Sequence, residues 1–189
     1  MHRIAVFAGR SEIDTPDAFA SAHRIGQLLG ESRRTVIYDG CLVGPINTLV
    51  AAAKGAGSRI VSVMVGDAPA LDDQIERRTI GTPAEFGAAV RLLADAFLAL
   101  PNGFPSLEEA LAVWDWSLPR RQEQPLGLLD LGNYYSDLLK QASDGAVDRF
   151  VRESQRGQLI VSSDSVDLLR RLAEYRPPET RRSGVADFE

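Results

Sequence analysis

The sequence has a single cysteine, Cys41, and only two histidines among its 189 residues. One thiol cannot form an internal disulfide, and three Cys and His side chains in all are too few for a zinc cluster. A chain with so little sulfur chemistry suits a reducing compartment. We therefore expect a cytoplasmic protein.

Long hydrophobic runs are also missing. The longest, such as residues 94–101, are far shorter than the roughly 20 apolar residues that cross a bilayer. The apolar run at residues 4–9 has the length of a strand, and no processing site follows it. We expect neither a signal peptide nor a membrane partner.

An excess of positive charge is likewise absent, since the formal net charge is −5. The arginine pairs at residues 33–34, 120–121 and 181–182 are short and scattered, whereas nucleic acids are bound by clustered Lys and Arg. We expect no nucleic-acid partner. The 44% hydrophobic and 25% charged residues that are present give the balance of an ordinary globular domain.

Short apolar or β-branched segments alternate with helical patterns along the chain. Strands are predicted at residues 4–9, 35–38, 59–65, 96–100, 126–131 and 159–161. Helices are predicted at residues 15–30, 49–57, 83–95, 106–116, 134–140, 145–153 and 166–175. This alternation implies right-handed crossovers and a parallel sheet. We expect one α/β domain over residues 1–176, a Rossmann-like doubly wound parallel sheet flanked by helices, and a disordered tail at residues 177–189.

In such a sheet, ligands bind at the carboxyl ends of the strands, where helix amino termini offer free N–H groups. Three predicted loops lie there, at residues 9–11, 39–44 and 101–109. The candidate ligand-binding residues in them are Gly9, Arg10, Ser11, Asp39, Gly40, Gly44, Asn102, Gly103 and Ser106.

Residues 95–109, DAFLALPNGFPSLEE, carry a resemblance to a known family. They resemble the strand and PGGxGTxxE loop of the lonely-guy (LOG) phosphoribohydrolases. Residues 6–9 are similar to that family's amino-terminal VFCGSS strand, and residues 124–135 resemble its KPxxLLN…GYY segment. The likeness runs in order over residues 3–175.

Members of the LOG family cleave the N-glycosidic bond of a nucleoside 5′-monophosphate, typically a cytokinin riboside monophosphate. The resemblance implies a nucleotide-like or nucleoside-like ligand, no metal or organic cofactor, and a homodimer with the site near the subunit interface. In the family the glutamate that closes PGGxGTxxE acts with the arginine of an ERK motif on the preceding helix. That glutamate is Glu109 here, the catalytic candidate, because an oxocarbenium-like transition state is stabilised by a nearby carboxylate.

The ERK motif itself differs in this chain. Its arginine falls on Phe86 and its lysine on Gly87, and only Glu85 is retained. Arg91 lies five residues after Phe86, about 140° further around a helix, and would point elsewhere. Residues 77–78, both arginine, are expected in the preceding loop, from which they could move in.

The phosphate-binding loops differ as well. PGGxGT becomes PNGFPS, in which Pro105 removes an amide donor and fixes φ where the family has glycine. Residues 38–47, YDGCLVGPIN, resemble the family's YGGGxxGLMG but gain the carboxylate of Asp39 and the amide-less Pro45. Lost donors and added negative charge both oppose binding of a phosphate dianion.

Several candidates have a second interpretation. Glu109 is either catalytic or the last residue of a capping box that begins at Ser106. Arg10 contacts an anion or is a surface residue. Asp39 binds a ribose hydroxyl or only initiates an Asp-Gly turn. Cys41 lies in a site loop, but no histidine near it in sequence would activate a nucleophile.

Two functional hypotheses follow. The first is a diverged LOG-like hydrolase that keeps Glu109 and acts on an altered substrate, such as a nucleoside or glycosylated base without a 5′-phosphate. The second is an inactive LOG-like pseudoenzyme that binds a ligand or assembles with an intact paralogue as a hetero-oligomer. The family's ordinary activity fits Phe86 and Pro105 least. Trp116 matches a family tryptophan and is expected in packing or an interface.

Overall fold

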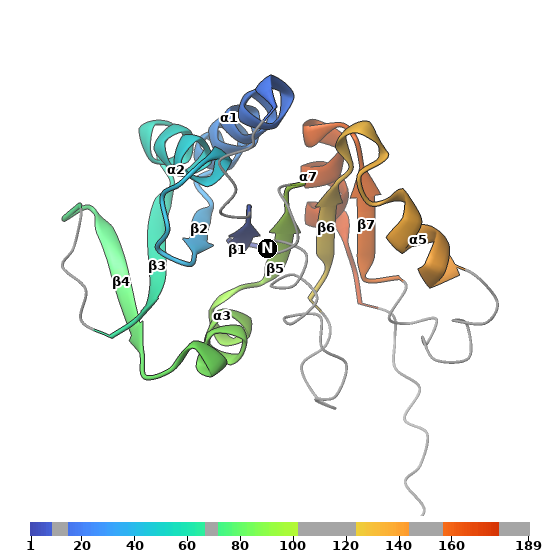
Figure 1. Ribbon diagram of the computed structural model, residues 1–189. Coiled ribbons are helices and arrows are strands. Elements are labelled where there is room, and N and C mark those ends of the chain that lie inside the picture. Colours follow the sequence, from blue (N-terminus) through green and yellow to red (C-terminus); the bar gives the residue numbers. More distant parts are fainter. Residues whose placement is uncertain (9–14, 67–71, 102–123, 144–156, 178–189) are drawn as a thin grey trace, which may run out of the picture.

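Seven parallel strands form one sheet in a computed structural model that describes residues 1–8, 15–66, 72–101, 124–143 and 157–177 (Figure 1). The strands are β1 (Arg3–Phe7), β2 (Thr35–Tyr38), β3 (Arg59–Val65), β4 (Ile75–Ile80), β5 (Ala96–Ala99), β6 (Leu126–Leu129) and β7 (Leu159–Ser162). Their order in the sheet is β4-β3-β2-β1-β5-β6-β7, and every neighbouring pair is parallel. The Rossmann-like, doubly wound sheet predicted from the sequence is confirmed.

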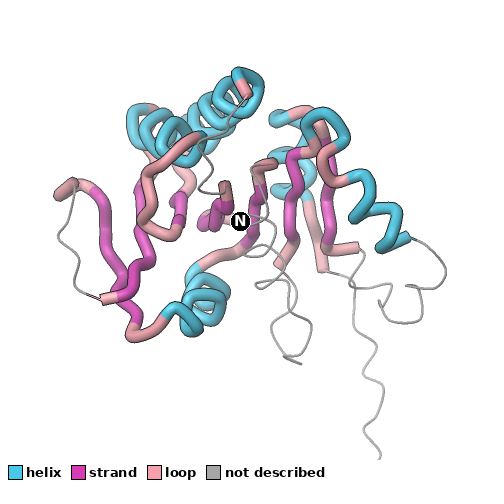
Figure 2. Tube along the Cα trace, in the orientation of Figure 1, coloured by secondary structure: helices cyan, strands magenta, loops and turns pink. Residues whose placement is uncertain are grey.

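Helices cover both faces of this sheet (Figures 1 and 2). The described helices are α1 (Pro16–Glu31), α2 (Pro45–Gly55), α3 (Phe86–Leu93), α5 (Ser136–Ser143) and α7 (Ser165–Glu174), with short 3-10 turns η1 (Pro83–Glu85) and η2 (Leu131–Asn133). Helices α1, α2 and α7 pack on one face, and α3 and α5 pack on the other. The predicted helices at residues 106–116 and 145–153 lie outside the described residues.

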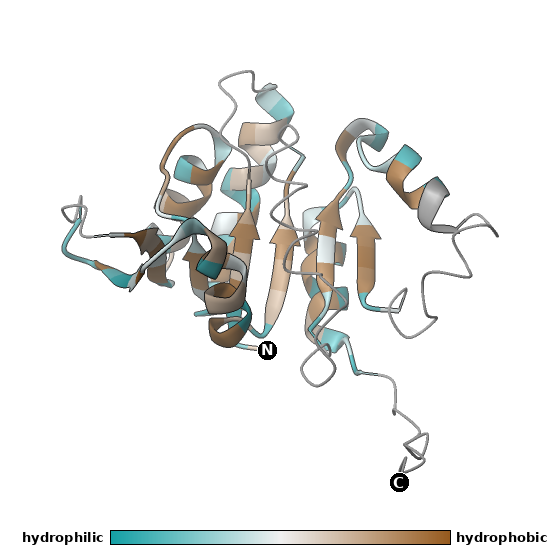
Figure 3. Cartoon of the chain, turned by 60° about the horizontal axis from the view of Figure 1, so that its bottom comes forward, coloured by the Kyte–Doolittle hydropathy of each residue, from teal (hydrophilic) through white to brown (hydrophobic). Residues whose placement is uncertain are grey.

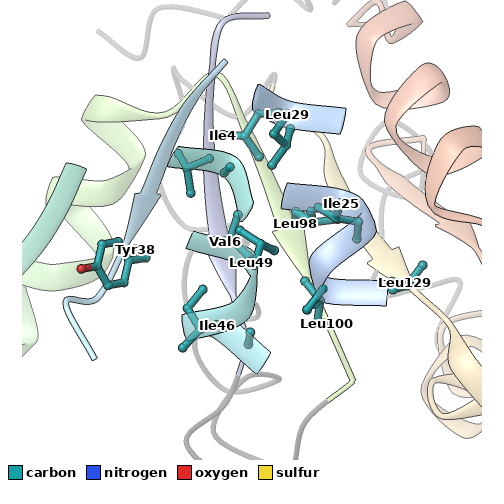
Figure 4. Close-up of a cluster of buried hydrophobic side chains, with 14 of the residues drawn as sticks. Ile4, Val6, Ile25, Leu29, Tyr38, Ile46, Leu49, Leu98, Leu100 and Leu129 are labelled. Carbon is teal, nitrogen blue, oxygen red and sulfur yellow. The ribbon is translucent and has the colours of Figure 1, made fainter. Parts of the chain in front are cut away.

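The strands in the middle of the sheet are buried on both faces. Ile4 and Val6 of β1 face α1 and α2, whereas Ala5 and Phe7 face the side of α3. Figure 4 labels the first cluster, which joins Ile4, Val6, Leu98 and Leu100 to Ile25, Leu29, Ile46 and Leu49 from the helices. The hydropathy colouring in Figure 3 agrees, since the central strands are brown. Compact apolar runs therefore became central strands, as predicted.

Helices α1 and α2 touch closely because α1 carries glycine where they meet. A Cβ on Gly26 would lie 2.4 Å from the carbonyl oxygen of Leu49, and one on Gly30 would lie 2.3 Å from the Cβ of Ala56. Real Cβ atoms do not approach so near, so any side chain would push the helices apart. The two glycines therefore set how closely α1 and α2 pack side by side.

The start of α1 agrees with the sequence, and the starts of α2 and α3 differ from the predicted ones. Thr15 accepts a hydrogen bond from the backbone N–H of Ala18, at 3.3 Å, and Pro16 is the first helical residue. Helix α2 begins at Pro45, four residues earlier than predicted. The helix predicted at residues 83–95 begins as the turn η1, and α3 follows it.

The strand β4 was not predicted, because its sequence IERRTI lacks a run of apolar residues. The expectation that Arg77 and Arg78 lie in a loop is wrong, since both belong to this strand. In the parallel register Arg77 is beside Ser62 and Arg78 is beside Val63, so the two arginines point to opposite faces. An edge strand has one neighbour and exposes much of its surface, which permits such a polar sequence.

Asp95 links the amino ends of β1 and β5. One carboxylate oxygen accepts from the backbone N–H groups of His2, at 2.7 Å, and Arg3, at 2.9 Å, and the other accepts from the Arg3 guanidinium at 2.8 Å. Burial would raise the pKa of Asp95, but these bonds outweigh it and lower the pKa. The linkage therefore stabilises the fold above the ordinary carboxyl pKa and weakens as the pH falls through the lowered value.

The helix contact gives a prediction with a matched control. Gly26→Ala should lower the free energy of unfolding by about 1–3 kcal/mol, because its Cβ has no room. Gly55→Ala, at the end of α2, places its Cβ in open space and should leave stability unchanged or raise it by up to about 1 kcal/mol. Urea denaturation measures both. Equal effects at the two positions would contradict the close contact.

Candidate functional site

The three loops predicted to form the site begin at one edge of the sheet. β1 pairs with β5 up to Phe7 and Ala99, and with β2 at Ala5 and Ile37, so the carboxyl ends of these strands are neighbours. Of the candidate residues, the structure describes those in the loop after β2, Asp39, Gly40 and Gly44. The other candidates lie outside the described residues: Gly9, Arg10, Ser11, Asn102, Gly103, Ser106 and Glu109. Their assignment stays a prediction.

The loop 39–44 is a tight turn held by Asp39. The Asp39 Oδ1 atom accepts a hydrogen bond from the backbone N–H of Cys41 at 2.9 Å. Gly40 follows with φ +80°, and a Cβ there would lie 2.4 Å from the Cγ of Met64. The turn-forming interpretation of Asp39 is confirmed. Binding of a ribose hydroxyl by the same carboxylate stays a prediction.

Helix α2 starts at the end of this loop. Gly44 is its N-cap, with φ +71°, and no side chain caps the first turn. Pro45 is the first helical residue, and the N–H of Asn47 is bonded to the Gly44 carbonyl at 3.1 Å. Proline supplies no N–H, so this amino terminus offers an anion fewer donors than a helix start without proline.

Tyr38, the last residue of β2, is nearly fully buried beside the loop. Burial, followed by the negative charges of Asp39 and Asp72 and the nearby Cys41, raises the pKa of Tyr38 to about 12. Its hydroxyl is therefore neutral at physiological pH. It can donate a hydrogen bond at this edge of the sheet but cannot act there as a base.

Phe86, at the position to which the family resemblance assigns the ERK arginine, makes an apolar contact. Phe86, the first residue of α3, packs against the core cluster on the α3 face of the sheet together with Ile80 and Ala89. Glu85 instead accepts hydrogen bonds from the Gly81 N–H at 3.1 Å and the Thr82 hydroxyl at 3.0 Å. The retained glutamate thus stabilises a turn before α3, with bonds that resemble those of a capping box.

The other arginines do not fill the place of Phe86. Arg77 points to the opposite face of the sheet, the side of α2. Arg78 is on the α3 side, where it forms an ion pair with Glu76 at 2.6 Å. Arg91 lies further along α3, as the helix geometry predicted. Sequence reasoning could not separate Arg77 from Arg78, because it did not recognise the strand whose alternation divides them.

Within the described ranges, no group of three or more His, Cys, Asp or Glu side chains is arranged to hold a metal ion. In the same part of the chain, no helix has the length and apolar character needed to cross a membrane.

Comparisons with known proteins agree with this architecture. A sequence-family profile described as "Possible lysine decarboxylase" matches residues 85–172. Among solved structures, the molybdenum cofactor binding protein from Rippkaea orientalis superposes with a TM-score of 0.70 at 16% identity, covering 92% of this chain and 96% of that one. The molybdenum cofactor carrier protein from Chlamydomonas reinhardtii gives 0.70 at 15% identity, covering 92% and 99%. These likenesses show a shared Rossmann-like α/β fold.

Similarity in sequence identifies the family, whereas the structural similarity shows the fold alone. The chain is 32% identical over 180 residues to a probable cytokinin riboside 5′-monophosphate phosphoribohydrolase of Oryza sativa subsp. japonica, covering 93% of this chain and 73% of the rice protein. It is 29% identical over 188 residues to a cytokinin riboside 5′-monophosphate phosphoribohydrolase of Arabidopsis thaliana, covering 93% and 82%. The chain belongs to the LOG family, as its motifs indicated.

The buried tyrosine gives a prediction about alkaline pH. Tyr38 ionises near pH 10 in the unfolded chain and near pH 12 in the folded chain. The part of the free energy of unfolding that depends on keeping this phenol neutral, about 2–3 kcal/mol, is therefore present below pH 10 and is lost between pH 10 and 12. Subtracting the ultraviolet titration curve of Tyr38→Phe from that of the wild type should leave the curve of one phenol with the raised pKa. A difference curve with its midpoint near pH 10 would refute the burial effect.

Proposed function

We propose that the protein hydrolyses the N-glycosidic bond of a nucleoside-like substrate, with its preference shifted away from 5′-monophosphates. Support for the reaction class comes from the family, whose relatives in rice and Arabidopsis carry the name of phosphoribohydrolases. The observation that carries the shift is that Phe86 packs against the core cluster at the position to which the family resemblance assigns an arginine.

The loop 39–44 supports the same change in substrate. A phosphate dianion at the start of α2 would meet the carboxylate of Asp39, while Pro45 gives it no N–H. Like charges repel, and the remaining donors must then outweigh that repulsion together with the cost of desolvating the phosphate. A neutral sugar lacks this conflict, and a carboxylate can accept a hydrogen bond from a ribose hydroxyl.

In the proposed reaction, Glu109 stabilises the positive charge that develops on the anomeric carbon as the bond to the base breaks. Water adds to that carbon and loses a proton, and the departing base nitrogen gains one, so the products are a free base and a free sugar. The chemistry needs no metal and no organic cofactor. We also propose a cytoplasmic homodimer, as the family resemblance implies.

The direct test incubates the protein with adenosine monophosphate, a cytokinin riboside monophosphate and unphosphorylated nucleosides, and measures released base by chromatography. We expect release from the nucleosides and little from the monophosphates. Glu109→Gln should reduce the rate by about 10²-fold or more, because the amide carries no charge to stabilise the transition state. The neighbouring Glu108→Gln is the matched control and should retain the wild-type rate.

Release from monophosphates alone would sink the proposed shift in substrate and restore the family's ordinary reaction. Release from nucleosides that survives in Glu109→Gln would leave the reaction class standing and remove Glu109 from its catalytic role.

The packing of Phe86 also favours a second candidate, an inactive member that binds a partner. Replacing the cation by an apolar contact is the kind of change that removes a catalytic group while it preserves the fold. In that case the protein is a pseudoenzyme that assembles with an intact paralogue as a hetero-oligomer. Absence of base release from every substrate, together with co-purification of a related chain, distinguishes this candidate from the hydrolase.

A further inference from the structure

The sequence has three sulfur-bearing residues, Met1, Cys41 and Met64. Two of them lie at the same loop. Cys41 belongs to the loop 39–44, and Met64 lies near the carboxyl end of β3, the strand that pairs with β2. Both internal sulfur side chains are therefore at the edge of the sheet where the candidate site begins.

The Met64 thioether lies across the backbone of Gly40. A Cβ added to Gly40 would be 2.4 Å from the Met64 Cγ, 2.8 Å from its Sδ and 3.3 Å from its Cε. The end of the methionine side chain therefore fills the space beside this glycine, whose φ of +80° belongs to the turn closed by Asp39. Closely packed atoms leave no room for a larger group, so either the loop or the methionine must shift to accept one.

Met64 is partly open to solvent. Its side chain is half-buried, and the next residue of the strand, Val65, is 44% exposed. Among the described residues, neither core cluster includes Met64, so its chemistry can change without opening the interior of the protein. A change in this side chain therefore acts first on the loop that it touches.

We propose that a peroxide oxidises Met64 to methionine sulfoxide, and that this reversible change displaces the loop 39–44 and switches the candidate site off. For what the site does, the inference rests on the proposed function, but the displacement of the loop is tested without it. In the reaction the sulfur attacks one peroxide oxygen, the S–O bond forms and the O–O bond breaks. With hydrogen peroxide, the proton on the attacked oxygen passes to the departing one, which leaves as water. The thioether is oxidised and the peroxide is reduced.

The sulfoxide differs from the thioether in bulk and in polarity. The new oxygen is carried by the Sδ atom, which lies against Gly40. It is also a hydrogen-bond acceptor, whereas the thioether is a flexible apolar group that fills irregular gaps. The turn beside it is closed by the bond from the Cys41 N–H to the Asp39 carboxylate. Added bulk and polarity at Met64 therefore act on the part of the loop that holds Asp39.

The test treats the Cys41→Ser protein with hydrogen peroxide, so that oxidation of the thiol cannot contribute. Mass spectrometry of proteolytic peptides should show one added oxygen atom on Met64. Backbone amide shifts of the ¹⁵N-labelled protein should change at residues 39–44 and stay the same in β6 and β7, on the far side of the sheet. The two methionine sulfoxide reductases, one for each sulfoxide epimer, should restore the original spectrum.

Release of base from nucleosides is the second readout. In the same Cys41→Ser protein, oxidation should lower the rate by about tenfold or more, because a displaced loop misplaces the bound substrate. The reductases should restore the rate. The matched control adds Met64→Leu to this background, which keeps Met1 but has no thioether beside Gly40. Leucine and methionine are close in volume, and each protein is compared with itself before and after treatment.

Absence of added oxygen on Met64 under conditions that oxidise Met1 overturns the proposal. So do unchanged shifts at residues 39–44 once Met64 is oxidised, and so does an equal loss of activity in the Met64→Leu control. If the untreated wild type releases no base from any substrate, the proposed function fails separately. The amide shifts then decide by themselves whether the loop responds to Met64.

Discussion

The strands in the centre of the sheet are buried on both faces, and this double burial governs where the helices and the candidate site lie. In β1 and β5 the buried side chains alternate between two separate clusters, one under α1, α2 and α7 and one under α3 and α5. Because β1 pairs with both β2 and β5, the chain leaves the middle of the sheet in both directions. Loops from the two halves therefore start side by side at its carboxyl edge, which is where sheets of this type bind ligands.

The helices and strands that flank the loop 39–44 are also closely packed. Gly26 and Gly30 let α1 pack against residues 49–56 of the α2 region, while Met64 fills the space beside Gly40. Asp39 then closes the turn with its own carboxylate. The loop is thus shaped by Met64 of β3 on one side and by the Asp39 carboxylate within the turn.

How much the sequence could predict depends on which physical signal each element leaves. The central strands are predictable because double burial demands compact apolar runs, and α1 because Thr15 and Pro16 mark its start. The edge strand β4 was not predictable, because a strand with one neighbour and a solvated surface needs no apolar pattern. In consequence Arg77 and Arg78 were assigned to a loop.

In the candidate site, too, some features could be predicted from the sequence and others could not. Family motifs indicated which positions to compare, including Glu109 and Phe86. They could not show that Phe86 packs against the core cluster, that Glu85 holds a turn, or that Arg77 lies on the other face of the sheet from Phe86. Those facts depend on contacts between segments far apart in the chain, and a single sequence carries no direct record of them.

The partial burial of Phe86 bears on what an arginine at this position would cost. The ring packs with Ile80 and Ala89 against the core cluster on the α3 side and keeps part of its surface in water. An arginine introduced there would lose the apolar contacts of the ring, but its long side chain could carry the charge out to solvent along the same surface. Stability and charge are therefore traded against each other at a single position, and the fold itself tolerates either side chain.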